Sequence, residues 1–358
     1  MTHIMDIFAA RAVRLRARIE AFLAAEAQNS VTISKWAADA LPRLAAFAGQ
    51  GKLLRGNLAL LGCELGGGTL TDGLYDIGAA LEIVHSSILV HDDIIDEDLQ
   101  RRGAPTLHAA YARQFAATAG LAPARARRVG EALATCAADA GFFAAYSLLC
   151  DAAPEAEALR RIVRLWSREF AHVALGEMDD LELSLSGTPA SLDSILQFYR
   201  SKTARYTFCV PLETGLLCAQ APATIMAPVR ALGEQLGIIF QIKDDELGLF
   251  GEATEIGKPV GSDVMQNKKT VYHHYLFAKV GAADAARLRQ LFGAAQVGAE
   301  DMTYVRQMLV DSGAKAAVDA LVGAHARAAH ACVTAIPVAA AQQEQLRQLV
   351  EYSITRTK

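Results

Sequence analysis

The stretch His91-Asp92-Asp93-Ile94-Ile95-Asp96-Glu97, followed by Arg101-Arg102-Gly103, closes a segment with helical periodicity. The apolar residues of that segment recur at helical spacing, at Ile77, Leu81, Val84, Ile88 and Ile95. Asp92 and Asp96 are one helical turn apart, so a helix stacks them on one face. Two like charges stacked in this way destabilise an empty helix mildly, and the pair is better explained if a cation lies between them.

The residue types around this acidic stretch indicate a metal and a phosphate. Carboxylate oxygens suit magnesium, which keeps several waters and bridges to phosphates. Arg101 and Arg102 carry the planar forks that bind phosphate with two hydrogen bonds. A solvated turn at a helix end is the alternative. Because His85 extends the polar stripe along an otherwise apolar helix, where polar groups need partners, we favour a metal-diphosphate site.

A second acidic pair lies far along the chain. Phe240-Gln241-Ile242-Lys243-Asp244-Asp245 ends a predicted helix that begins near Pro228. Gly237, Gln241, Asp244, Asp245 and Gly248 share one face of that helix, and the two glycines leave room for a group to approach. We expect this pair to face the first across a cavity and to hold further magnesium.

The two stretches and their flanks resemble the trans-isoprenyl diphosphate synthase (polyprenyl synthetase) family. The matching segments run in the family's order: residues 51–55, His85, and residues 92–96, 101–108, 202–203, 240–245, 257–263 and 268–270. Three positions depart from the family pattern. Gly248 stands where the second motif normally has a third aspartate, and Leu53 and Gly56 replace the usual arginine and proline of the first element.

The resemblance implies a role for each matching residue. The metal ligands would be Asp92, Asp96 and Asp244, which together with Lys202 form the catalytic group. The diphosphate of the allylic substrate would also meet Arg101, Lys258 and Lys268, with hydrogen bonds from Gln241 and Thr203. Isopentenyl diphosphate would bind in a separate basic pocket made by Lys52, Arg55, His85 and Arg102.

The implied reaction is a magnesium-dependent head-to-tail condensation of isopentenyl diphosphate with an allylic diphosphate. The product would be an all-trans polyprenyl diphosphate, with geranylgeranyl diphosphate (C20) favoured over longer chains. Ser87 and Ile88 are too small to close the tunnel before Asp92, so its floor is assigned to Phe142, Phe143 or Tyr146, which core packing also explains.

Two other functions stay open. A terpene cyclase shares an aspartate-rich helix, but it does not need the second diphosphate pocket of Lys52, Arg55 and Arg102. A non-catalytic partner subunit would explain Gly248 as decay, although Arg101 and Asp244 are intact. Asp179-Asp180 imitates an acidic motif, but no arginine pair follows it, and we expect a structural role there.

Composition and periodicity predict an all-α fold. The resemblance implies a single domain over residues 1–358, an antiparallel helical bundle around a deep central cavity, with residues 1–30 as a packing helix. It also implies a homodimer. A net charge of −4 without a basic stripe argues against nucleic acid as a partner. We expect no membrane span and no signal peptide. The six scattered cysteines indicate reduced thiols and a cytoplasmic protein.

Overall fold

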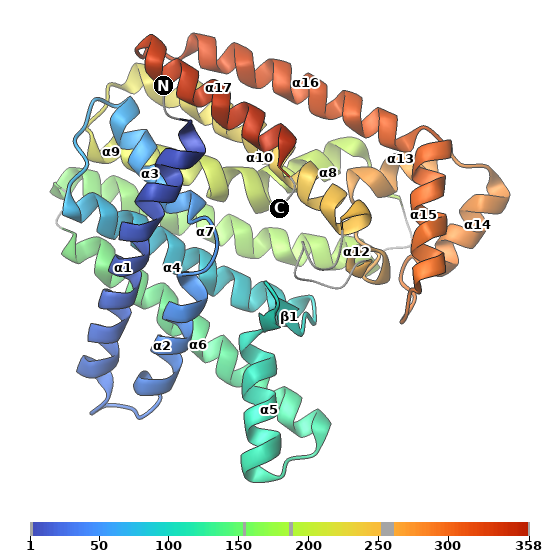
Figure 1. Cartoon of the computed structure of the whole chain (residues 1–358), viewed down its shortest axis with the longest axis horizontal. Helices are drawn as coiled ribbons and strands as arrows, with labels where there is room; N and C mark the ends of the chain where they lie inside the picture. Colours follow the sequence, from blue (N-terminus) through green and yellow to red (C-terminus); the bar gives the residue numbers. More distant parts are fainter. Residues whose placement is uncertain (1–2, 153–154, 186–188, 252–260, 357–358) are drawn as a thin grey trace. The chain divides into compact units, whose positions relative to one another are not determined.

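A computed structural model describes residues 3–152, 155–185, 189–251 and 261–356 (Figure 1). Within these ranges nearly all secondary structure is helical. The strands found there are β1 (Gln100–Arg101) and β2 (Ala104–Pro105), which pair antiparallel. The all-α prediction is therefore confirmed. The chain forms two compact units, unit 1 with Met1–Leu165 and Pro211–Met226, and unit 2 with Trp166–Val210 and Ala227–Lys358. The single domain and its central cavity stay predictions.

Unit 1 is built on the long helix that carries the first acidic motif. Its helices are α1 (Ile4–Ser30), α2 (Ala37–Ala48), α3 (Leu54–Leu65), α4 (Asp72–Ile95), α5 (Leu107–Ala119), α6 (Pro123–Asp151), the first part of α7 (Ala156–Leu185), and α9 (Val210–Cys218). The Thr71 side chain caps α4 by accepting the Leu74 N–H, which satisfies one orphan donor of the helix. Helices α1, α3 and α6 pack against α4 and fix the direction of its acidic end.

Helix α6 approaches α4 very closely. A side chain at Gly141 of α6 would lie 2.3 Å from Oγ of Ser87 on α4, so any larger residue would force neighbouring side chains to shift. Ser87 is fully buried in this contact and therefore points toward α6. Figure 1 also shows α5 running back along the first half of α6.

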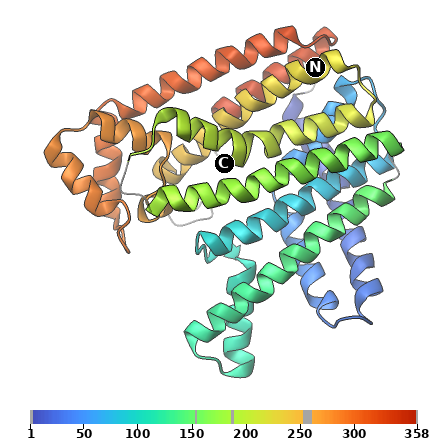
Figure 2. The same cartoon turned by 180° about the vertical axis from the view of Figure 1, so that it is seen from behind.

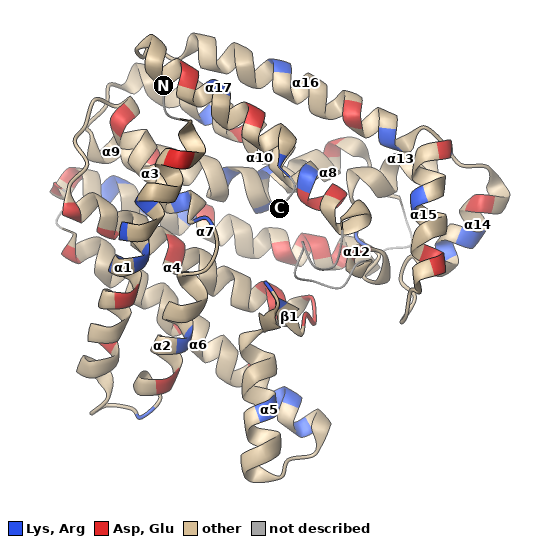
Figure 3. Ribbon diagram, viewed as in Figure 1, with Lys and Arg blue, Asp and Glu red and all other residues tan. Residues whose placement is uncertain are grey.

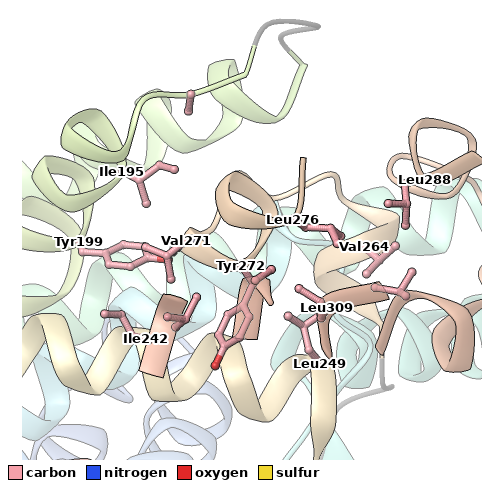
Figure 4. Close-up of a cluster of buried hydrophobic side chains, with 14 of the residues drawn as sticks. Ile195, Tyr199, Ile242, Leu249, Val264, Val271, Tyr272, Leu276, Leu288 and Leu309 are labelled. Carbon is pink, nitrogen blue, oxygen red and sulfur yellow. Dashed lines mark hydrogen bonds between the residues drawn. The ribbon is translucent and has the colours of Figure 1, made fainter. Parts of the chain in front are cut away.

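Unit 2 comprises the rest of α7 and the elements that carry the second acidic motif. These are α8 (Leu192–Tyr199), the π-helix η1 (Arg200–Cys209), α10 (Ala223–Phe250, from Ala227 on), α12 (Ser262–Met265), α13 (Val271–Lys279), α14 (Ala282–Leu291), α15 (Ala299–Asp311), α16 (Ala314–Ala335) and α17 (Ala340–Thr355). Helices α16 and α17, in orange-red and red, run side by side in Figure 2. The core of the unit gathers Tyr199, Ile242, Leu249 and Tyr272 (Figure 4).

The π-helix η1 is unusual in length, since such turns mostly occur singly and often at functional sites. It carries Lys202 and Thr203. Helix α10 crosses it in direct backbone contact, because a side chain at Gly237 would lie 2.1 Å from Cα of Ala204. The group that approaches Gly237 is therefore the backbone of η1.

Two helices of the described residues, α4 and α6, are long and apolar enough to cross a membrane by length and composition. In their most apolar windows 72% and 39% of the residues are buried in the fold. A core helix of a folded domain passes the same test. The absence of a membrane span stays a prediction.

Candidate functional site

The first acidic motif lies at the carboxyl end of α4. Asp96 is the residue that ends the helix, and its backbone N–H donates to the Asp92 carbonyl oxygen at 2.8 Å. Asp92 and Asp96 therefore stand on successive turns, as their spacing predicts. The side chain of Asp92 is 17% exposed, whereas that of Asp93 is 1% exposed. Of these two neighbours, Asp92 is the one that a ligand can reach.

Arg101 of β1 is held by the aspartates of this motif. Its Nε–H donates to Asp93 Oδ1, and its Nη2 lies 3.1 Å from Asp92 Oδ2 and 3.8 Å from Asp98 Oδ2. Burial alone would lower the pKa of Arg101, but Asp92 and Asp93 outweigh it and raise that pKa. Figure 3 shows both charge colours around β1. The arginine is a fixed cation beside the candidate metal ligands.

The predicted basic pocket is largely brought together within unit 1. Arg55, in the first turn of α3, is buried, and Arg102 reaches back so that its Nη2 would lie 3.1 Å from a side chain at Gly51. Burial, followed by the cations of Arg55 and Arg102, lowers the pKa of His85 well below its ordinary value. His85 is therefore a neutral hydrogen-bonding group near neutral pH. Lys52 is exposed and lies two residues before α3 begins.

Glu82 was not identified from the sequence. It is buried on α4 one turn before His85, and its Oε1 accepts the Gly56 N–H at 2.7 Å. Burial raises the pKa of Glu82, although Arg55 opposes that shift. It ties the basic segment of α3 to α4. An acid within an apolar helix face is the signal that could have found it, since buried carboxyl groups need partners.

In the second acidic motif, Asp245 is buried and Asp244 is half-buried. The Tyr199 hydroxyl donates to Asp245 Oδ2, and Gln241 Nε2 donates to Asp245 Oδ1 at 2.9 Å. Thr203 donates to Gln241 Oε1 at 2.6 Å, which links η1 to the network. Burial, then the charge of Asp263, raises the pKa of Asp245 well above its ordinary value. Asp245 therefore links α10 to α8 and, through Gln241, to η1. Asp244, with its side chain 41% exposed, is the candidate metal ligand.

Gly248 stands where the family pattern has a third aspartate, and the carboxylate of another residue, Asp263, lies beside it. A side chain at Gly248 would lie 2.8 Å from Oδ2 of Asp263 on α12. The carboxylate of Asp263 therefore lies where Gly248 leaves space. Gly248 and Asp263 belong to different helices, so helical periodicity could not predict that they lie close together.

The two described lysines of the predicted diphosphate site share one acid. Lys202 Nζ lies 2.8 Å from Glu177 Oε2 and 3.1 Å from Asp180 Oδ2, and Lys268 Nζ lies 2.7 Å from Asp180 Oδ2. Burial alone would raise the pKa of Asp180, but the two lysines outweigh it and lower that pKa. Acidic residues of this part of α7 appear red in Figure 3. Lys258 lies outside the described residues.

The donor set fits magnesium. Among the described residues no three His, Cys, Asp or Glu side chains converge as a complete metal cage. Asp92 and Asp96 on α4, and Asp244 on α10, each offer carboxylate oxygens and leave most coordination positions to other ligands. Magnesium binds in this way, through one or two carboxylates together with waters and substrate phosphates.

An all-helical fold with two aspartate motifs, each beside fixed cations, fits the class of helical proteins that bind diphosphates through divalent metals. The chain belongs to the polyprenyl synthetase family, whose model matches residues 40–309. It is 33% identical over 230 residues to a geranylgeranyl diphosphate synthase of Sulfolobus acidocaldarius, across 63% of this chain and 62% of that enzyme. It is 28% identical to a geranylfarnesyl diphosphate synthase of Aeropyrum pernix, across 86% of this chain and 91% of that enzyme.

The fold is also similar to a solved structure of that family. The crystal structure of geranylgeranyl pyrophosphate synthase from Corynebacterium glutamicum, complexed with isoprenyl diphosphate and magnesium, superposes with a TM-score of 0.91. The two chains are 27% identical, and the match covers 98% of this chain and 99% of that one.

Proposed function

We propose that this protein is a magnesium-dependent prenyltransferase that condenses isopentenyl diphosphate head to tail with an allylic diphosphate. The observation that carries the proposal is the pairing, within unit 1, of the stacked Asp92 and Asp96 with the basic cluster of Arg55, His85 and Arg102. A terpene cyclase has one diphosphate to bind and gains nothing from that cluster. The product would be an all-trans polyprenyl diphosphate, with geranylgeranyl diphosphate favoured and a longer chain as the alternative.

The acidic residues would act on the leaving group. Asp92, Asp96 and Asp244 would hold magnesium, which when bound neutralises charge on the departing pyrophosphate. Arg101 is also held by the buried Asp93, so it would stay in place when a metal takes Asp92, and it would need little reorganisation to place a positive charge beside the same group. Gln241 and Thr203 would add hydrogen bonds.

Asp180 would position Lys202 and Lys268 so that they too can bind the departing pyrophosphate. Both ammonium groups contact its carboxylate, and this attraction offsets their mutual repulsion and keeps them close together. Lys258 would join them.

The basic cluster would seat the second substrate. Arg55 and Arg102 would bind the diphosphate of isopentenyl diphosphate, with Lys52 at the edge. The neutral His85 would contribute a hydrogen bond rather than a charge. Most of the acceleration would come from positioning and electrostatics.

We also propose a homodimer in the cytoplasm. Helix α7 of unit 2 exposes Leu175, Met178, Leu181 and Leu185 at helical spacing, and an exposed apolar stripe is typical of an interface. All six cysteines lie in the described residues and none forms a disulfide, in keeping with a reducing compartment.

The direct test incubates the protein with magnesium, isopentenyl diphosphate and allylic primers of increasing length, and separates the products by chromatography. Elongated all-trans products would support the proposal, and their length would decide between C20 and longer chains. No elongation with any primer would contradict it and favour the partner-subunit alternative.

A further inference from the structure

Asp244, the more accessible aspartate of the second acidic motif, is held by an arginine from the end of α17. Arg356, the residue that follows this helix, donates Nη1–H to Asp244 Oδ1. The same nitrogen lies 3.4 Å from the Phe240 carbonyl oxygen, and the guanidinium carbon lies 3.7 Å from the centroid of the Phe240 ring. The Arg356 side chain is only 9% exposed. A carboxylate, a carbonyl and an aromatic face together fix this cation in place.

We infer that Arg356 is the resident counter-ion of Asp244 and that a divalent metal ion must displace it to bind there. The inference rests on the proposed function, which assigns Asp244 to the metal. A magnesium ion needs a carboxylate oxygen at about 2.0–2.1 Å, and a guanidinium bonded to the same carboxylate would bring a second cation to within a few ångströms of it. Metal binding and the ion pair therefore compete.

The competition links the metal site to the end of the chain. Once a metal takes Asp244, Arg356 loses that carboxylate and keeps its contacts with the Phe240 carbonyl and ring. The last turn of α17, which Arg356 ties to α10, should then open more often. By linkage, removing the arginine should strengthen metal binding to the same extent that the arginine opposes it.

Manganese(II) binding to the full chain, measured by electron paramagnetic resonance without diphosphate, tests this directly. Arg356→Gln should bind manganese about two- to fivefold more tightly than the wild type, the range expected when a partly exposed ion pair is lost. Arg347→Gln is the matched control, because Arg347 lies on the same helix and pairs with Glu344 instead. It removes one positive charge from α17 and should leave the affinity nearly unchanged.

Asp244→Asn separates failure of the inference from failure of the proposed site. If Asp244→Asn loses a manganese site while Arg356→Gln equals the wild type, Arg356 does not compete and the inference is overturned. If Asp244→Asn binds as the wild type does, the assignment of Asp244 to the metal is wrong. A wild type and an Arg356→Gln variant that both fail to bind would overturn the competition as well.

Hydrogen exchange gives a second readout. Saturating magnesium should speed exchange of the amides of residues 352–356 in the wild type and leave it unchanged in Asp244→Asn. Unchanged exchange in a wild type that binds metal would overturn the inference.

Discussion

The two acidic motifs differ in how each stabilises its buried aspartate. In each, one aspartate is buried, its neighbour is only partly buried, and an arginine contacts the partly buried one. The buried Asp93 is neutralised by the charge of Arg101, whereas the buried Asp245 receives hydrogen bonds from the neutral Tyr199 and Gln241. The first motif is thus an ionic assembly, and the second rests on a carboxyl group whose pKa burial has raised.

This difference predicts which residues matter for turnover and which for stability. In the proposed site the partly buried members would bind ligands, and the buried members contact the elements packed around them. Substitutions at Asp92 and Asp244 should therefore act on catalysis, and those at Asp245 on folding.

The largest expected effect is at the first motif. Asp92→Ala should lower turnover by about 10²–10³-fold or more, because a group that stabilises the developing charge is lost. Asp179→Ala should keep turnover near the wild-type level, since that carboxylate is exposed on α7. Initial rates at saturating substrate and magnesium measure both. Equal losses would mean that the first motif is not the catalytic one.

A smaller effect is expected at Asp180, the acid that spaces two lysines. Asp180→Asn keeps the shape but leaves Lys202 and Lys268 near each other without the carboxylate between them. We expect kcat/KM for the allylic diphosphate to fall about tenfold, since a misplaced charged group costs transition-state stabilisation. Asp179→Asn, the adjacent exposed acid, is the control. An unchanged kcat/KM in Asp180→Asn would show that the lysines do not depend on this acid.

The first motif was predictable because its parts are close in sequence. An i, i+4 spacing places Asp92 and Asp96 on one face of the helix, and Arg101 follows shortly after the helix ends. The second motif was only half predictable. Helical periodicity put Gln241 and Asp245 on one face, where they do bond, but it cannot say which distant element meets that face.

Long-range partners decided what the sequence left open. Tyr199 for Asp245, Arg356 for Asp244, and Asp180 for two lysines all depend on packing between elements far apart in the chain. For the same reason the sequence could not say which group approaches each glycine: the backbone of η1 lies against Gly237, and the Asp263 carboxylate lies beside Gly248. Of the three candidate floor residues, Phe143 is exposed, while Phe142 packs edge-on against His91 at 5.6 Å.

The smallest expected effect concerns the protonation of the buried Asp245. The pKa of Asp245 is raised in the folded state, so the folded chain binds this proton more tightly than the unfolded chain does. Stability therefore falls as pH rises from the ordinary aspartate pKa, about 4, toward the raised value, with a slope of at most about 1.4 kcal/mol per pH unit. Asp245→Asn removes the titrating group and should flatten that part of the profile. Urea unfolding from pH 4 to pH 8 measures the difference. Asp179→Asn should retain the wild-type slope, and the same slope in Asp245→Asn would mean that Asp245 is ionised in the folded protein, as an aspartate paired with an arginine is.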